Sequence, residues 1–294
     1  MKSPFLAILF LAIPLMLSFS IKASATSADC HKPDISSFEI ANSKVFTIDS
    51  KILNRKYDLY IKLPRDYSTK KSQSKKYPVL YLNDGPHTFK VAAGVTHFAS
   101  MDKAIIVGIS FAQGEDGQSS RVRDLTPVVD KSWQKYTTGG APQYLEFIEQ
   151  EVFPFIEKNY RADTSNRILS GHSLGGSFGM WVLLTKPALF SGYILTSPSF
   201  WFKNDYIFGL EHEYSKHNPS LNANLYVATG ALETPKNGMH NNMVTGHTRF
   251  LKQLRARNYQ GLHISDEIVT GTDHFSTFPV GLAKGLRETY QNLK

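Results

Sequence analysis

The chain has 294 residues, 41% hydrophobic and 20% charged, with a formal net charge of +8, a composition typical of a globular protein with one sizeable core. It contains one cysteine, Cys30, so no disulfide can form within the chain. No linker, repeat or low-complexity tract separates the apolar segments, and no nucleic-acid motif accompanies the modest positive charge. Composition therefore favours one globular domain and gives no reason to expect a nucleic-acid partner.

The first 25 residues have the three regions of a secretory signal peptide. Lys2 precedes an apolar run from Phe5 to Ile21, and small residues follow up to Ala25. We predict cleavage after Ala25, which leaves residues 26–294 as a single domain. Because the leader carries two lysines and no acidic residue, the charge then falls from +8 to +6. We expect an exported protein, periplasmic or secreted, without a stable membrane span. An uncleaved anchor, or a lipid on Cys30, is the less favoured alternative.

The mature chain is predicted to begin with an antiparallel hairpin that forms one edge of a sheet. Apolar and polar residues alternate over Phe38–Asp49 and Tyr57–Leu63, on either side of a polar turn at Asn54–Lys56. Short, nearly continuous apolar runs then predict six strands that are buried on both faces. These runs are Tyr77–Leu82, Ala104–Ile109, Ile168–Ser170, Tyr193–Thr196, Leu225–Ala228 and Ile264–Val269.

Helical patterns lie between these runs. The clearest extends from Pro142 to Tyr160, where Pro142 suits a first turn and Pro154 is expected to kink the helix. Further helices are predicted at Gly175–Leu184, Met243–Arg257 and Phe278–Leu293. Alternation of strands and helices after an antiparallel start predicts the α/β class, as a three-layer sandwich with a mainly parallel central sheet.

Residues 171–176 read GHSLGG and contain a G-x-S-x-G motif between an apolar strand and a helical pattern. This is the context of the nucleophile elbow of the α/β-hydrolase fold, a turn so tight that small residues are expected on both sides of the nucleophile, Ser173. The N–H of Leu174 would then face a developing oxyanion. His172 is interpreted as a packing or hydrogen-bonding neighbour and not as the base. A mere tight turn is the alternative, but strand, helix and the second glycine, Gly176, together favour a nucleophile.

A serine hydroxyl needs a base, and in this fold the acid and then the histidine follow the serine along the chain. His274 is predicted to be the base, because it follows the last apolar run and precedes the last helix. Glu233, just beyond an earlier strand, is the first candidate for the acid, ahead of Asp205 and Asp273. A solvated loop glutamate would look the same in sequence. The histidines show no metal-binding spacing, so neither a metal nor an organic cofactor is expected.

The second donor of an oxyanion hole usually comes from the loop after an early strand. Here that loop is Asn83–His87. Pro86 has no N–H, so His87 is the predicted donor.

The long connection from Ser110 to Pro142 is predicted to contact the substrate, because connections of this length are usually functional or disordered. It contains the cations Arg121, Arg123, Lys131 and Lys135 and the aromatic residues Trp133 and Tyr136, a pattern that suits an anionic, ring-bearing ligand. The alternative is that these arginines pair with Asp124 or Asp130 at the surface.

The motifs resemble the Putative esterase family, which includes enterobactin-type siderophore esterases, S-formylglutathione hydrolase, feruloyl esterases and bacterial mycolyltransferases. The resemblance covers most of the mature chain and rests on seven segments. They are Tyr81–Gly85, Arg123–Pro127, Gly139–Ala141, Phe153–Ile156, Gly171–Gly176, Ser197–Trp201 and Gly271–His274.

The siderophore-esterase branch is the most similar, with an arginine-rich segment like Arg121–Pro127 and a serine-proline-serine-aromatic loop like Ser197–Trp201. The resemblance implies hydrolysis of a small-molecule carboxylic ester through an acyl-serine, without a cofactor, and Trp201 beside the two arginines as a substrate-binding residue. Some members of this branch lack a clear acid, so a dyad without Glu233 stays open.

Two other functions remain open. The first is acyl transfer on the same scaffold, because the sequence does not say whether water or an alcohol accepts the acyl group. The second is a catalytically inactive exported binding protein, against which the intact Ser173 and His274 argue. For the esterase, we expect a preference for anionic or aromatic acyl esters over long neutral lipids.

Overall fold

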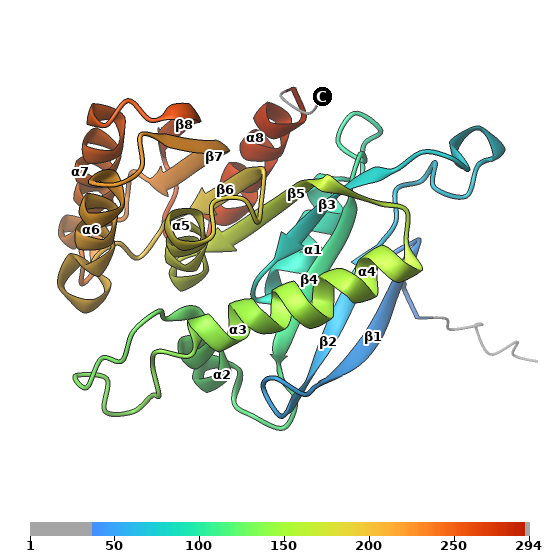
Figure 1. Cartoon of the computed structure of the whole chain (residues 1–294), viewed down its shortest axis with the longest axis horizontal. Helices are drawn as coiled ribbons and strands as arrows, with labels where there is room; N and C mark the ends of the chain where they lie inside the picture. The colour runs from blue at the N-terminus through green and yellow to red at the C-terminus, as the bar shows by residue number, and fades with distance from the viewer. Residues whose placement is uncertain (1–36, 292–294) are drawn as a thin grey trace, which may run out of the picture. The chain divides into compact units, whose positions relative to one another are not determined.

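The computed structural model describes residues 37–291, in which eight strands form one sheet with the order β1-β2-β4-β3-β5-β6-β7-β8 (Figure 1). The strands are β1 Ser43–Ser50, β2 Arg55–Lys62, β3 Tyr77–Leu82, β4 Ile105–Ala112, β5 Ala162–His172, β6 Gly192–Thr196, β7 Ser220–Gly230 and β8 Gln260–Val269. The hairpin β1–β2 is antiparallel and β2 pairs antiparallel with β4, whereas β4, β3 and β5 to β8 are mutually parallel. The mainly parallel sheet with an antiparallel N-terminal edge is confirmed.

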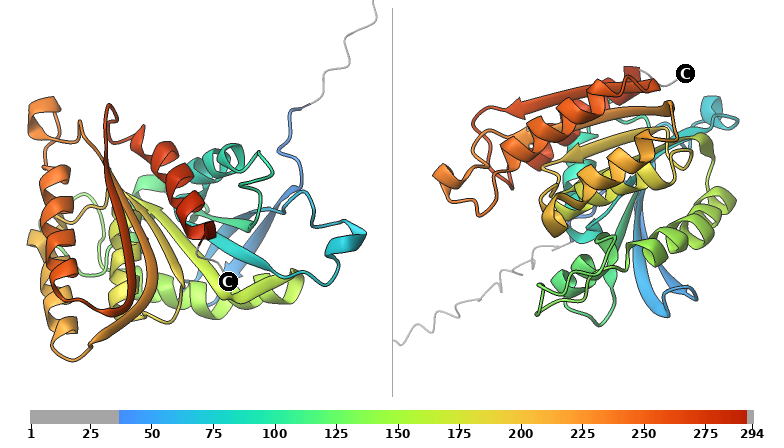
Figure 2. Two further views of the ribbon diagram at one scale, coloured as in Figure 1. Left: turned by 90° about the horizontal axis from the view of Figure 1, so that it is seen from above. Right: turned by 60° about the vertical axis from the view of Figure 1, so that its left-hand side comes forward.

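Helices cover both faces of the sheet (Figure 2). They are α1 Gly85–Val95, α2 Gly117–Leu125, α3 Ala141–Phe147, α4 Phe153–Asn159, α5 Leu174–Thr185, α6 Phe202–Ser215, α7 Met243–Ala256 and α8 Thr277–Gln291. On one face, α1 and α8 bury residues such as Phe89 and Leu282 against the strands. On the other, α3 to α7 bury a larger cluster that includes Phe147, Phe178 and Phe250. The predicted three-layer α/β-hydrolase sandwich is therefore confirmed.

The long helix predicted from Pro142 to Tyr160 is realised as α3 and α4 joined by the π-helical segment Ile148–Val152. Pro154 therefore lies in the first turn of α4, where its missing N–H costs little. The wider π-helical turn takes the place of the kink expected at Pro154, and the ribbon in Figure 1 runs on as one rod.

Two local predictions are wrong. The hairpin turn falls at residues 51–54 and so begins three residues before the predicted Asn54–Lys56, because Asn54 adopts a left-handed φ of 50° and β2 begins directly after it. The strand β8 was expected to be buried on both faces, but it ends the sheet, and Val269 is its one buried residue. An apolar run does not distinguish a central strand from an edge strand.

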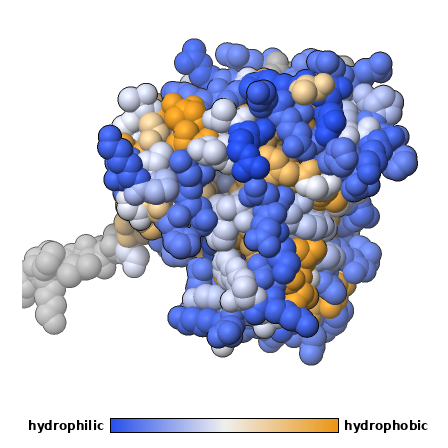
Figure 3. Space-filling view, turned by 90° about the vertical axis from the view of Figure 1, so that its left-hand side faces the viewer, coloured by the Kyte–Doolittle hydropathy of each residue, from blue (hydrophilic) through white to orange (hydrophobic). Residues whose placement is uncertain are grey.

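The surface on the side of α6 and α7 is mainly hydrophilic, and its hydrophobic residues form separate patches (Figure 3). Among the helices of residues 37–291, none combines the length and the hydropathy needed to cross a bilayer. The predicted signal peptide, its cleavage site and Cys30 lie outside the described residues, so the division into leader and domain stays a prediction.

Candidate active site

Ser173 occupies the turn between β5 and α5 in a strained conformation, with φ 59° and ψ −117°. Three backbone hydrogen bonds hold it there. Its N–H donates to the carbonyl of Thr196 at 2.9 Å, and its carbonyl accepts from the N–H groups of Ser177 at 3.0 Å and Ser199 at 3.1 Å. Leu174 is the first residue of α5, so its N–H belongs to the helix terminus that has no intrahelical acceptor. The turn thus presents the Ser173 hydroxyl beside a helix N-terminus.

The glycines around Ser173 differ in how strictly the turn requires them. A Cβ on Gly171 would lie 2.1 Å from the carbonyl oxygen of Gly175, and one on Gly176 would lie 3.1 Å from Pro198. At Gly175 the nearest atom, on Asn83, would be 3.5 Å away, which is an ordinary contact. The turn therefore requires glycine itself at Gly171, whereas at Gly175 it would also accept the methyl group of an alanine.

His274, in the loop between β8 and α8, contacts Glu233 from the loop after β7. The distance from His274 Nδ1 to Glu233 Oε2 is 2.6 Å. If Nδ1 carries the proton that the carboxylate accepts, Nε2 keeps a lone pair for a hydroxyl proton. Ser173 and His274 line the same pocket, and the Oγ atoms of Ser173 and Ser199 are 3.3 Å apart.

The carboxylate of Glu233 is fully buried and hydrogen-bonded on both oxygens. Oε1 accepts from Ser197 Oγ at 2.6 Å, from Gly230 N–H at 2.7 Å and from Thr277 Oγ1 at 3.2 Å. Burial by itself raises the pKa of Glu233, but hydrogen bonds from His274, Ser197 and Gly230 outweigh it and hold the pKa below its ordinary value. The group is therefore ionised at neutral pH.

The two alternative acids are engaged elsewhere. Asp205 accepts from Arg249 at 3.0 Å. Asp273 closes its own turn by accepting from the backbone N–H groups of Phe275 at 3.2 Å and Ser276 at 2.8 Å. Glu233 is thus the carboxylate that contacts the His274 ring.

The pocket beside Ser173 has a volume of about 830 Å³. Its apolar lining comes from Val91, Phe111, Phe275, Phe278 and Pro279. Its charged lining, among the described residues, consists of Asp84, Asp116 and Arg121. Phe275 is 84% exposed although it directly follows His274, so its ring is open to a ligand at the mouth of the pocket.

His87 lines this pocket, but the prediction of its N–H as the second oxyanion donor is wrong for this geometry. The N–H of His87 donates to the carbonyl of Asp84 at 2.9 Å. Asp84, with a left-handed φ of 57°, caps α1, and Pro86 lies in the first turn. The loop after β3 is therefore short, because α1 begins at Gly85, and the N–H of His87 points into the helix.

Arg121 and Arg123 lie on different faces of α2, because residues two apart on a helix are separated by about 200°. Arg121 lines the pocket; its Nε donates to Asp84 Oδ1 at 2.9 Å and its Nη2 to the carbonyl of His172 at 3.1 Å. It ties α2 to the residue before Ser173.

Arg123 does not belong to the pocket lining, and its prediction as a substrate-binding residue is wrong. Its Nε donates to Asp124 Oδ1 at 2.8 Å, its Nη1 pairs with Glu115, and its Nη2 lies 3.3 Å from Tyr57 Oη. The side chain is only 16% exposed. The alternative expectation, an ion pair with Asp124, describes this residue better, although the pair is mostly buried.

Trp201 is also displaced from its predicted role at the Ser173 pocket. Its ring stacks on Trp133, with centroids 6.2 Å apart and planes inclined by 12°. It lines a neighbouring hollow of about 210 Å³ with residues such as Phe200 and Arg249. The reason is the contact with Trp133, which lies in the long connection from Ser110 to Pro142. The sequence alone does not reveal this contact.

Sequence reasoning missed the environment of His172. Its ring centroid is 4.5 Å from that of His274, and its Nδ1 is 3.0 Å from Thr196 Oγ1. Burial lowers the pKa of His172 well below its ordinary value, and the nearby His274 and Arg121 lower it further. The neutral ring is thus a wall of the site. The position next to Ser173 was the only available signal.

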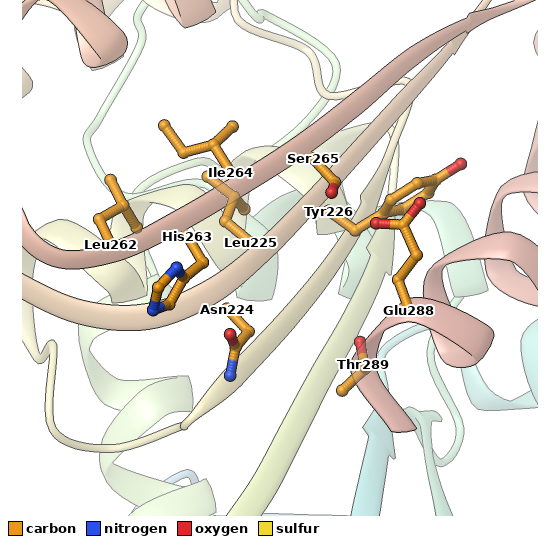
Figure 4. A pocket seen from close by; sticks show the side chains of 9 residues that line it. All are labelled: Asn224, Leu225, Tyr226, Leu262, His263, Ile264, Ser265, Glu288 and Thr289. Atoms are coloured by element: carbon orange, nitrogen blue, oxygen red, sulfur yellow. The ribbon is translucent and has the colours of Figure 1, made fainter. Parts of the chain in front are cut away.

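A separate polar pocket of about 360 Å³ lies between β7, β8 and α8 (Figure 4). Figure 4 shows Glu288 of α8 reaching up beside the ring of Tyr226. Asn224 and Tyr226 belong to the middle of β7, short of the carboxyl ends of the parallel strands where Ser173 lies. Within residues 37–291, no group of three or more metal-ligating side chains is arranged to hold an ion.

A family model described as "Putative esterase" matches residues 50–289. Ferri-bacillibactin esterase BesA of Bacillus subtilis is 31% identical over 272 residues, which cover 85% of this chain and 90% of that protein. The solved structure of the BES protein from Bacillus cereus is 29% identical with a TM-score of 0.75, and covers 87% of this chain and 97% of its own. An IroE-like serine hydrolase from Shewanella oneidensis is 27% identical with a TM-score of 0.74, at coverages of 85% and 80%.

The contrast between the two glycines gives a test of the turn. Gly171→Ala should lower the free energy of unfolding by about 1–3 kcal/mol or more and abolish ester turnover, because the new methyl group meets the carbonyl of Gly175. Gly175→Ala is the matched control and should keep a melting temperature close to that of the wild type. Thermal denaturation of the two purified variants measures this, and equal stability would contradict the described turn.

Substitution of Arg121 and of Arg123 should have different effects on stability and on substrate preference. Arg123→Ala should lower the free energy of unfolding by about 3–5 kcal/mol, because it leaves Asp124 without its cation. It should lower kcat/KM equally for an anionic aryl ester and its neutral isostere. Arg121→Ala removes the one cation among the described lining residues and should change the ratio of those two kcat/KM values. A change of ratio in Arg123→Ala would restore its predicted substrate contact.

Proposed function

The chain belongs to the Putative esterase family, and from that membership we propose that Ser173 is the nucleophile, His274 the base and Glu233 the acid of the active site. The chain is a carboxylic-ester hydrolase of the serine type. The observation that carries the assignment is the 2.6 Å contact of His274 Nδ1 with the buried carboxylate of Glu233. His274 lines the same pocket as Ser173.

In the first half of the reaction, Ser173 Oγ attacks the ester carbonyl carbon while His274 Nε2 accepts the hydroxyl proton. The carbonyl oxygen takes the negative charge, which the N–H of Leu174 at the start of α5 stabilises. When the tetrahedral intermediate collapses, the C–O bond of the ester breaks and the alcohol leaves with the proton from His274. Water then attacks the acyl-serine by the same steps and releases the acid.

Glu233 orients the imidazole and stabilises the imidazolium that forms when His274 takes the proton. Its lowered pKa supports this role, because a carboxylate must be ionised to do it. The dyad alternative has less support than the triad, since the carboxylate is fully buried and aimed at the ring.

For the substrate, we propose an ester of the siderophore type with a bulky, ring-bearing part. The Bacillus subtilis relative is a ferri-bacillibactin esterase, and relatives from Aspergillus fumigatus and Emericella nidulans, matched over 56% and 50% of this chain, are siderophore esterases. A pocket of about 830 Å³ with three phenylalanines in its lining suits such a group. The lining gives less support to a preference for anions, because Arg121 is paired with Asp84 and Asp116 adds a negative charge.

The leader sequence supports export as part of this proposal: we propose that the chain works in the periplasm or outside the cell, after cleavage near Ala25. Detection of the mature N-terminus in the periplasmic or secreted fraction tests it. The relatives named above are esterases and hydrolases, so neither acyl transfer nor loss of catalysis is favoured.

Removal of the proposed catalytic groups should have graded effects. Ser173→Ala and His274→Ala should each lower ester turnover by about a thousandfold or more, because nucleophile and base act as a unit. Glu233→Gln should cost less, on the order of tens to thousands of fold, because it does not itself transfer the proton. Steady-state kinetics on a 4-nitrophenyl ester measures the losses. A fluorophosphonate probe should label the wild type and not Ser173→Ala; near-normal turnover of that variant would end the assignment.

Phe275 should contribute to binding of ring-bearing substrates. Phe275→Ala should lower kcat/KM for a benzoate-type ester by about two- to tenfold and leave that for an acetate ester nearly unchanged, because only the first loses an aromatic contact. The matched control is Phe98→Ala, which removes a phenylalanine that is 72% exposed and does not belong to the pocket lining. Equal losses on both esters would mean that Phe275 supports the His274 loop and not the substrate.

A further inference from the structure

A second imidazole network lies behind the site, centred on His247 of α7. This side chain is 2% exposed and both of its ring nitrogens are engaged. Nδ1 lies 2.9 Å from Thr229 Oγ1 on β7, and Nε2 lies 2.8 Å from Asp266 Oδ2 on β8. Asp266 also pairs with Arg255 on the last turn of α7. One buried ring thus connects a helix to two adjacent strands.

The order hydroxyl, imidazole and carboxylate resembles a catalytic triad, but the burial of its hydroxyl excludes that use. Thr229 is 1% exposed, so a substrate carbonyl cannot reach its Oγ1. The Asp266 carboxylate can only accept, so Nε2 of the His247 ring carries the proton and donates to it. In a neutral ring, Nδ1 is then unprotonated and accepts from the Thr229 hydroxyl. The network is therefore a tether and not a nucleophile.

The tether is next to a group that holds Glu233 in place. Thr229 precedes Gly230, whose N–H donates to Glu233 Oε1 at 2.7 Å. One turn before His247, the N–H of Met243 at the start of α7 donates to the carbonyl of Glu233 at 3.1 Å. Helix α7 therefore holds the acid at its backbone and at the strand end that orients its carboxylate.

The β8 side of the tether leads to the loop that carries His274. Asp266 is three residues before Val269, whose carbonyl accepts from Thr272 Oγ1 at 3.0 Å and from Ala231 N–H at 2.9 Å. The end of β8 thus contacts both loops, the one that carries Glu233 and the one that carries His274. A change in the spacing of β7 and β8 at this level would shift both.

We propose that His247 is a positioning residue that clamps β7 and β8 to α7 and thereby keeps Glu233 in contact with His274. This rests on the proposed roles of Glu233 and His274. The clamp is built for a neutral ring, because a protonated Nδ1 could no longer accept from Thr229. Burial lowers the pKa of His247, against the opposing effects of Asp266 and Glu233 and with a further lowering by Arg255.

The test measures kcat, KM and the acid limb of kcat/KM against pH for His247→Leu and Thr229→Val in the full mature chain. Both variants keep the size of the side chain and break the tether. We expect kcat to fall by up to about 100-fold in His247→Leu, and less in Thr229→Val, with KM within about twofold of the wild type, because small misplacements of a catalytic group are costly. The acid limb should move to lower pH, because an imidazolium without a well-placed carboxylate forms less readily.

The acid limb reports His274, and the groups that face this ring are Glu233 and the neutral ring of His172, beside which Arg121 lies. Neither substitution touches His172 or Arg121. A shift of the limb therefore reports the placement of Glu233. Retention of the wild-type acid limb in both variants would overturn the proposal. If His247→Leu does not fold, Thr229→Val alone decides, because it removes a single hydroxyl.

Tyr259→Phe is the matched control for a general loss of stability. It removes a buried hydrogen bond of 2.8 Å to Glu211, between the segment after α7 and helix α6, without a bond to Glu233 or His274. It should lower the melting temperature and leave the acid limb unchanged; a shift like that of Thr229→Val would also overturn the proposal. Fluorophosphonate labelling of Ser173 separates the role of His247 from the assignment of Ser173 as the nucleophile. If the acid limb does not shift in the variants but Ser173 is still labelled, the proposal for His247 fails and the assignment of Ser173 stands.

Discussion

A fully buried carboxylate, that of Glu233, is the constraint around which the site is arranged. Burial alone raises its pKa and favours the neutral form. Hydrogen bonds from Ser197, Gly230 and Thr277, in addition to that from His274, compensate for the lost water and keep the charge. The donors come from the connection after β6, the last residue of β7, the loop after β8 and the first residue of α8. The carboxylate can therefore ionise in the interior only once these segments have been brought together.

The parallel sheet brings them together, because the carboxyl ends of β5, β6, β7 and β8 lie along one edge. At two neighbouring strand ends the chain turns so sharply that non-glycine residues adopt positive φ: 59° at Ser173 and 45° at Ser197. Both are held by backbone bonds to the next strand, Ser173 N–H to Thr196 and Ser197 N–H to Ala228 at 2.6 Å. Strain in the chain is thus concentrated where side chains must converge and is balanced by the rigid sheet.

Features that depend on local patterns could be predicted from the sequence: the order of the strands along the chain, though not their ends, the turn at Ser173 and the position of His274 after the last strand. Glu233 was ranked first for the same reason, although the hydroxyls that bury it come from distant segments and gave no signal. Arg123 was misassigned because the helix α2 was not recognised, and without it the opposite directions of two arginines two residues apart are invisible. The predicted contact of Trp201 with the substrate has a different difficulty: its stacking on Trp133 is a tertiary contact, which local sequence patterns do not reveal.

The length of a glutamate explains how one side chain serves two loops. Oε1 accepts from Gly230 N–H and so closes the turn that carries the residue itself, while Oε2 faces His274. The backbone repeats the link, because Glu233 N–H donates to the Gly230 carbonyl at 3.0 Å. An aspartate would end one carbon–carbon bond, about 1.5 Å, nearer the chain and could not keep both contacts without moving the turn. Gly230 is equally restricted, because a Cβ there would lie 2.4 Å from the carbonyl of Thr272. The orientation of the His274 imidazole therefore depends on the conformation of four consecutive residues, 230–233. The fold brings this turn into contact with the ring.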